Sequence, residues 1–152
     1  MMVYSLRTCH RALIAITLFS SLFFHSLAAH ATEATLEVWV ISGDLKGSTQ
    51  PFPEKLSPLR RSLRKTFPKV RRFTRLRHKR LSLQSERSSR LQLNREKSAF
   101  FHLRGQSEER YRLQLSLRPG RVEMNLRARR GQIFYQAMRQ RGRLLILGMR
   151  FL

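Results

Sequence analysis

Cysteine is almost absent from this chain, as are the short motifs that many enzymes share. The only cysteine is Cys9, so the residues after it contain no disulfide, no thiol nucleophile and no cysteine-based metal site. The sequence also lacks a glycine-rich phosphate loop, a G-x-S-x-G elbow and an H-E-x-x-H helix. These absences exclude the hydrolase, metalloprotease and nucleotide-binding classes that those motifs define.

Histidine and acidic residues are also scarce. After residue 31 the only histidines are His78, which lies in a basic run, and His102, which lies in a predicted strand. The only adjacent acids, Glu108 and Glu109, fall in a predicted loop, where they temper the local charge. We interpret both histidines as surface or hydrogen-bonded strand residues. We therefore expect no enzyme, no metal site and no cofactor.

The first 31 residues are typical of a secretory signal peptide. Arg7 and Arg11 supply positive charge, residues 12–24 form an apolar stretch, and residues 29–31 (Ala-His-Ala) form a cleavage site. The apolar stretch is shorter than the roughly 20 residues that a membrane-spanning helix needs. We predict cleavage after Ala31 and a secreted or periplasmic protein. The alternative is that the segment is kept as an N-terminal anchor.

The chain after residue 31 is strongly basic. Without Arg7 and Arg11, the remaining 121 residues hold 29 Lys and Arg against 9 Asp and Glu, a net charge of +20. Arg outnumbers Lys by 25 to 6 in the full chain, and its planar guanidinium matches phosphate and carboxylate geometry better. Such a charge attracts polyanions. A biased nucleotide composition is the alternative explanation for the arginines.

Residues 32–152 are predicted to form a single domain that begins with one strand and one helix. Residues 36–42 alternate with apolar side chains on both faces, which predicts an inner strand. Ser57 and Pro58 predict the start of a short amphipathic helix, and Pro68 predicts its end. The apolar stripe of this helix consists of Leu56, Leu59, Leu63 and Phe67.

From residue 70 onward the apolar pattern has a period of two, in short segments separated by turns. This pattern predicts an antiparallel sheet or a small barrel-like sandwich, so we expect an α+β fold that is mostly antiparallel β-sheet. The last strand is apolar on both faces and is therefore predicted to be an inner strand. The predicted strands cover residues 70–77, 80–84, 89–93, 99–104, 111–117, 122–127, 133–138 and 144–151.

One hairpin is predicted in register. Pairing Leu117 with Val122 across a Pro-Gly turn places six apolar side chains on one face, and a slip of one residue would destroy the match. Like charges directly opposed are unfavourable, so arginines paired on the other face must extend into water or bind an anion. That register pairs Arg112 with Arg127, and Arg110 with Arg129.

The longest basic run covers residues 60–80, with eleven Lys and Arg and no acid. Phe67 and Phe73 interleave with the basic residues, a pattern that also occurs on nucleic-acid-binding surfaces. In residues 69–77, alternation places Arg71, Phe73, Arg75 and Arg77 on one face, with further arginine on the other. Arginine on both faces is typical of an edge strand, where charge prevents aggregation. Binding of an anionic partner is the alternative.

The order of these elements resembles that of small uncharacterised exported proteins of bacteria. The resemblance lies in an opening strand at residues 36–41, the helix leucines, an aromatic strand at residues 73–76, and a glycine before the aliphatic strand within residues 142–147. The resemblance covers most of the chain after residue 31, but it consists only of the spacing of apolar residues. It implies the same fold and provides no known catalytic or binding residues to carry over to this sequence.

Two functions remain open. We favour an exported, non-catalytic interaction domain that docks on a protein of the cell envelope. The alternative is a binding module for anionic polymers such as lipopolysaccharide, acidic glycans or extracellular nucleic acid. The candidate anion-binding residues are Arg71, Arg75, Arg77, Arg110, Arg112, Arg127 and Arg129.

Overall fold

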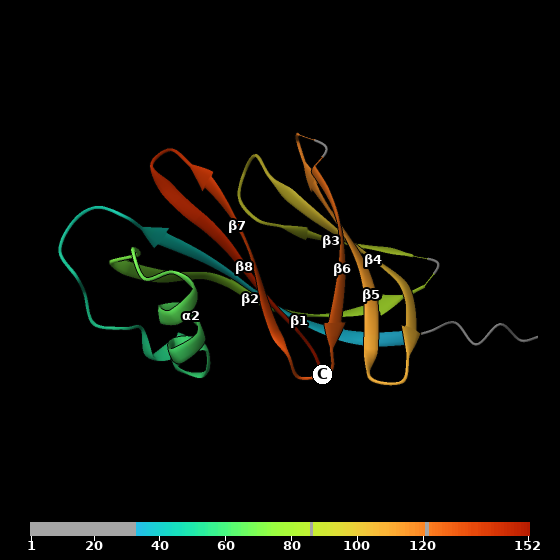
Figure 1. The fold of residues 1–152 in the computed structure, drawn as a ribbon. Coiled ribbons are helices and arrows are strands. Elements are labelled where there is room, and N and C mark those ends of the chain that lie inside the picture. The colour runs from blue at the N-terminus through green and yellow to red at the C-terminus, as the bar shows by residue number, and fades with distance from the viewer. Residues whose placement is uncertain (1–32, 86, 121) are drawn as a thin grey trace, which may run out of the picture. The chain divides into compact units, whose positions relative to one another are not determined.

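The computed structural model describes residues 33–85, 87–120 and 122–152 (Figure 1). The predicted signal segment, residues 1–31, lies outside the described residues. Ala31–Leu152 is a compact unit. None of the helices in the described part of the chain is long and apolar enough to cross a membrane.

Eight strands and two consecutive helical segments make up the described residues. The helical segments are the 3-10 helix η1 (Glu54–Leu59) and the α-helix α2 (Arg60–Thr66). The strands are β1 (Glu33–Asp44), β2 (Arg72–Gln84), β3 (Ser88–Gln92), β4 (Ser98–Ser107), β5 (Arg110–Arg118), β6 (Val122–Arg129), β7 (Ile133–Gln140) and β8 (Arg143–Phe151).

The strands form two four-stranded antiparallel sheets. Sheet A has the order β2-β1-β8-β7, and sheet B has the order β3-β4-β5-β6. The predicted fold, mostly antiparallel β-sheet with one short helix, is confirmed. The sheets do not close into a barrel, because β6 and β7 belong to different sheets, and β2 and β3 are joined by one isolated bridge, Gln84 to Arg87. Both strands predicted to be inner, β1 and β8, lie inside sheet A.

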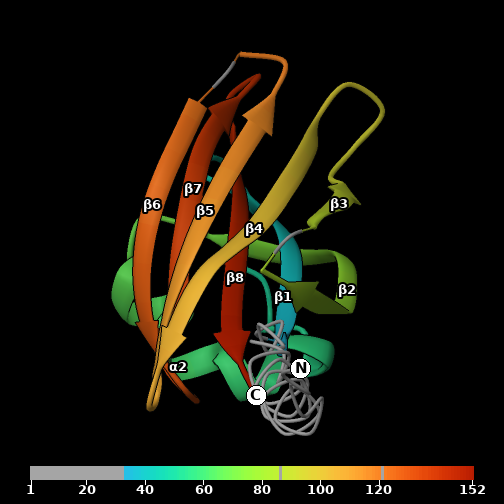
Figure 2. The same cartoon turned by 90° about the vertical axis from the view of Figure 1, so that its right-hand side faces the viewer.

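The main hydrophobic core lies between the two sheets. Val38 and Leu147 contribute from sheet A, and Phe101 and Leu115 contribute from sheet B. Tyr111 of β5 stacks on Phe151 of β8, with ring centroids 4.1 Å apart, and so ties the sheets together. Figure 2 looks onto sheet B and shows that none of the other helices and strands in residues 33–152 that the structure describes covers its outer face.

A second core lies between sheet A and the helical segments (Figure 1). Leu56, Leu59 and Leu63 are buried there, as the predicted stripe requires, while Phe67 is half-buried. The predicted helix start at Ser57 is wrong, because residues 54–59 form a 3-10 helix. There the Ser57 carbonyl, not its hydroxyl, accepts a hydrogen bond, from the Arg60 amide.

The basic segment after the helix is one strand rather than two. Residues 72–84 pair continuously with β1 apart from a bulge, and β2 is the edge strand that its arginines predict. The register shifts between Val40 and Ile41, so Leu76 is an extra residue and is 49% exposed. Because the bulge reverses the alternation, Arg77 lies on the opposite face from Arg75. The prediction that these two share a face is therefore wrong.

Candidate anion-binding face

Sheet B has one buried face and one face open to solvent. The hairpin register is confirmed, since Leu117 pairs with Val122 and the leucines of β5 point into the core. The outer face is strongly basic: the strands of sheet B contain one acid, Glu123, against seven exposed arginines. These are Arg90, Arg104, Arg110, Arg112, Arg118, Arg127 and Arg129.

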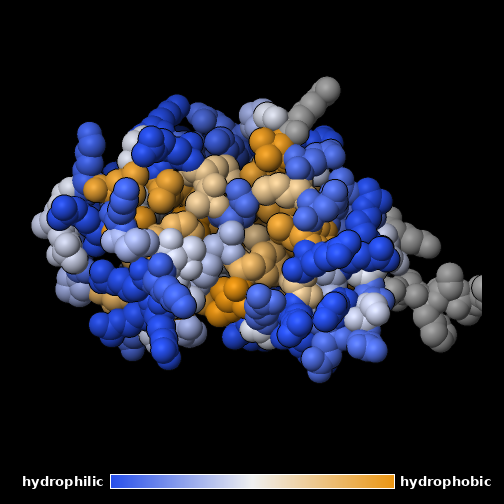
Figure 3. All heavy atoms as spheres, viewed as in Figure 1, coloured by the Kyte–Doolittle hydropathy of each residue, from blue (hydrophilic) through white to orange (hydrophobic). Residues whose placement is uncertain are grey.

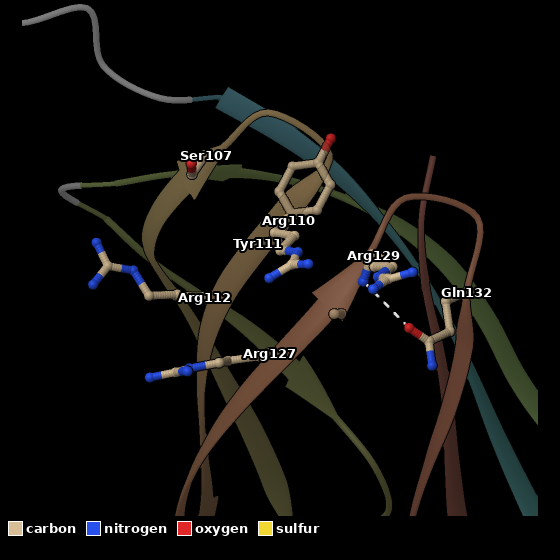
Figure 4. A pocket seen from close by; sticks show the side chains of 8 residues that line it. Ser107, Arg110, Tyr111, Arg112, Arg127, Arg129 and Gln132 are labelled. Atoms are coloured by element: carbon tan, nitrogen blue, oxygen red, sulfur yellow. Dashed lines mark hydrogen bonds between the residues drawn. The ribbon is translucent and has the colours of Figure 1, made fainter.

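Four of these arginines line one pocket of about 510 Å³. We call Arg110, Arg112, Arg127 and Arg129 the arginine quartet. Arg112 pairs with Arg127 and Arg110 with Arg129 across β5 and β6, as predicted. Figure 4 shows Arg112 and Arg127 extending to the same side of the two strands. The quartet brings four positive charges together, and no acidic residue from the described part of the chain lines the pocket.

No member of the arginine quartet forms an ion pair within the described residues. The acids that do form ion pairs act elsewhere. Asp44 of β1 pairs with Arg72 and Arg143, and Glu37 of β1 pairs with His78, Arg80 and Arg150. Carboxylates therefore neutralise basic residues of sheet A and leave the quartet in sheet B uncompensated.

Gly105 of β4 sets the position of Arg112. A β-bulge at Arg104 brings Gly105 opposite Arg112 in the register. A Cβ atom on Gly105 would lie 2.8 Å from Nη2 and 3.3 Å from Nε of Arg112, so the guanidinium lies directly over the glycine. The absence of a side chain there lets Arg112 lie against the sheet.

We expect Gly105→Ala to displace Arg112 and to lower affinity for heparin about threefold, because the methyl group would overlap the guanidinium. Isothermal titration calorimetry checks this. The control is Gly47→Ala, which introduces a side chain at a positive φ of 96° with nothing within 4 Å. An equal loss of affinity in both variants would refute the role assigned to Gly105.

A second pocket of about 800 Å³ lies at the other end of the same face. Its centre is Phe100, with Arg118 Cζ 4.9 Å and Arg90 Cζ 5.7 Å from the ring centroid. Hydrogen bonds from Arg90 to the Ser98 hydroxyl hold that guanidinium in place. This pocket is less purely basic than the first, since Glu96 and Glu123 also line it.

The sequence did not single out this second group. The sequence pattern that could have revealed this group is the alternation in residues 99–104. It places Phe100 and His102 on the face opposite Phe101 and Leu103. An aromatic side chain on a solvent-facing side of a strand is unusual enough to be noted. The arginines over Phe100 come from β3 and β5, and only the sheet order brings them to it.

The other three candidate residues do not join the quartet. Arg71 lines a separate pocket of about 370 Å³ near the helix end, and Arg75 is half-buried on the helix side of sheet A. Arg77 donates a hydrogen bond to the Gln92 carbonyl at the corner between the sheets. The predicted site of seven arginines is therefore divided: the four on β5 and β6 lie together, and the three near β2 lie apart.

The most buried charge lies in sheet A. Glu37 is 3% exposed; its carboxylate accepts hydrogen bonds from Arg150, and its Oε1 lies 2.9 Å from Nε2 of His78. Burial alone raises the pKa of Glu37, but the hydrogen bonds and positive charges of Arg150 and His78 outweigh it. The pKa of Glu37 therefore lies below its ordinary value. Trp39 stacks on His78, with centroids 5.1 Å apart, and packs the cluster against the sheet.

Both histidines in the described residues have partners. His78 contacts Glu37, and Nε2 of His102 lies 3.0 Å from the Ser85 carbonyl oxygen. Within the described residues, no group of three His, Cys, Asp or Glu side chains is placed to hold a metal ion.

No family model matches the chain, and no curated protein or solved structure shows a significant match to it. Its function must therefore be argued from its own residues.

Proposed function

We propose that this protein is a non-catalytic module that binds anionic polymers through the outer face of sheet B. One observation carries the proposal: four arginines from two adjacent strands line one pocket, and none of the described residues places a carboxylate in it. Like charges held side by side are unfavourable without a counterion. An anion that bridges the two strands would relieve that repulsion, and guanidinium groups match sulfate, phosphate and carboxylate oxygens well.

An extended ligand fits this face better than a small ion. Arg112 of the quartet and Arg118 of the Phe100 pocket are six residues apart on β5, about 20 Å along the strand. Between them, Gln114 accepts a hydrogen bond from Arg104 and donates one to Glu123, so the intervening surface is polar. A polymer with repeated negative charges would contact both ends at once.

Export is part of the proposal. The signal-like segment at residues 1–31 favours a secreted or periplasmic location, where lipopolysaccharide, acidic glycans and extracellular nucleic acid are available. We assign no catalytic step. The sequence alone favours docking on an envelope protein, and the arginine quartet is the reason for preferring a polyanion.

The test compares retention of residues 32–152 on heparin and on a plain sulfonate resin of matched charge density. We expect elution from heparin at markedly higher salt, because a fixed arrangement of arginines recognises the geometry of the polymer as well as its charge. Elution from both resins at the same salt concentration would contradict the proposal, since it would mean that the net charge acts diffusely.

Docking on a protein remains the second candidate function. One specific observation favours it: the edge strand β7 of sheet A begins with six uncharged, half-buried residues, Ile133 to Met138.

A further inference from the structure

The two edges of sheet A are chemically opposite. The edge strand β2 contains five Lys and Arg, and charge of this kind prevents other strands from pairing with an edge. The edge strand β7 begins with Ile133-Phe-Tyr-Gln-Ala-Met138, which has no charge, proline or glycine. In a chain with a net charge of +22, an edge strand with six uncharged residues in succession is an exception.

The β7 edge is apolar on both faces and only half-covered. Phe134 and Met138 pack against the core between the sheets, while Ile133, Tyr135 and Ala137 pack against the core under the helix. All six residues from Ile133 to Met138 are half-buried rather than buried. β7 is hydrogen-bonded only to β8 within the described residues, so the backbone groups on its other side have no strand partner.

The neighbouring strand extends this apolar surface. β6, the edge strand of sheet B that precedes β7 in the chain, has Met124 and Leu126 half-buried against the main core. Val122 at its start is 49% exposed. Figure 3 shows the result as a band of hydrophobic residues across this side of the molecule, with hydrophilic residues above and below it.

Basic residues flank the uncharged segment at both ends. Arg129 and Arg130 precede it, and Arg139 and Arg141 follow it. Of these, only Arg141 forms an ion pair within the described residues, with Glu96, and both of those side chains are exposed. A ligand for this edge therefore meets apolar contacts in the middle and positive charge at each end.

We propose that the free edge of β7 binds an extended segment of a partner protein, which pairs with it as an additional strand. The segment has an apolar middle of about six residues and acidic residues at both ends. Main-chain hydrogen bonds along the edge supply affinity, and alternate side chains contact the half-covered rims of the two cores. This inference goes beyond polyanion binding, and Arg129 is the one member of the arginine quartet that also flanks this edge.

A second copy of this chain suits the edge less well. Each copy has a net charge of +22, and pairing β7 with β7 would bring the flanking arginines of both copies together. The flanking arginines that would repel a second copy would instead attract the acidic residues of a partner segment.

The test uses a fluorescein-labelled peptide, Glu-Glu-Val-Ile-Val-Thr-Val-Glu-Glu, and residues 32–152 of the protein. We expect saturable binding by fluorescence anisotropy below about 1 mM. In amide correlation spectra, the largest shifts should fall on residues 133–138. A peptide with the same side chains and N-methyl groups at alternate residues should bind at least about tenfold more weakly, because it cannot form the ladder of hydrogen bonds.

Ala137→Lys is the matched variant of the protein. Lysine on the edge should lower peptide affinity about tenfold although it adds positive charge, because charge on an edge strand blocks pairing. Heparin affinity should stay unchanged, which separates this inference from the proposed function. Conversely, Arg112→Gln with Arg127→Gln should leave peptide affinity within about threefold.

Several outcomes would overturn the inference. They are no binding below about 1 mM, equal binding of the N-methylated peptide, or equal binding by Ala137→Lys. A homodimer in sedimentation that Ala137→Lys dissociates would also overturn it, in favour of self-association. The comparison with the N-methylated peptide uses the protein without any substitution. It can therefore refute the inference even if the Ala137→Lys variant does not fold.

Discussion

Replacing Arg112 and Arg127 together by Gln is expected to weaken heparin binding roughly 10- to 100-fold at about 0.15 M salt. The two side chains lie opposite each other on β5 and β6 and extend to the same side (Figure 4). Each guanidinium that contacts the polymer releases about one counterion, so the slope of log affinity against log salt should fall by about two. Titration calorimetry at several salt concentrations measures both quantities.

The matched control removes the same charge elsewhere. Arg71→Gln with Lys79→Gln also lowers the net charge by two. Both residues are exposed; Arg71 directly precedes β2 and Lys79 lies in it. If the quartet is the binding site, this control should lose less than about threefold in affinity. If both double variants show the same loss of affinity and the same decrease in the slope of log affinity against log salt, binding depends on net charge alone. The assignment of the binding site to sheet B would then be wrong.

Glu37→Ala is expected to lower the free energy of unfolding by about 3 kcal/mol, because it leaves Arg150 and His78 without their buried countercharge. These partners are about one-third exposed, 31% and 33% for their side chains, which limits the loss. The control is Glu33→Ala on the same strand, where the carboxylate is exposed and the change should stay within about 0.5 kcal/mol. Urea unfolding measures both variants, and equal losses would contradict the role of the Glu37 cluster.

The stabilisation from Glu37 should also depend on pH. The pKa of Glu37 in the folded protein is lowered from 4.5, so the folded state favours the ionised carboxylate. The contribution is fully present above that ordinary pKa and is lost as the pH falls through the lower pKa of the folded protein. The difference in unfolding free energy between the native protein and Glu37→Ala should therefore be constant near neutral pH and shrink below about pH 4. A difference that grows with acid would contradict this.

Local patterns were sufficient to predict the hairpin that carries the arginine quartet. The apolar alternation of β5 and β6 permits one register, and that register determines which arginines face each other. The edge position of β2 and the inner positions of β1 and β8 also follow from their own side chains, by charge on both faces or apolar residues on both faces.

Features that depend on pairing between distant segments could not be predicted. The bulge at Leu76 arises from the match between β2 and β1, and it moves Arg77 to the other face from Arg75. Glu37 and Arg150 are 113 positions apart in the sequence, and they are in contact only because β1 pairs with β8. The exposed edge of β7 likewise follows from the sheet order, since its own residues are those of an ordinary half-buried strand.

The location of the bound polymer is the measurement that tests the central claim most directly. Amide and arginine Nε–Hε correlation spectra, recorded while a heparin hexasaccharide is added, report contacts residue by residue. We predict that the largest shifts fall on residues 110–112 and 127–129, with smaller shifts near Phe100 and Arg118 and little change in residues 60–80. Shifts of similar size over every basic segment, or a maximum in residues 60–80, would contradict the assignment of polyanion binding to the outer face of sheet B.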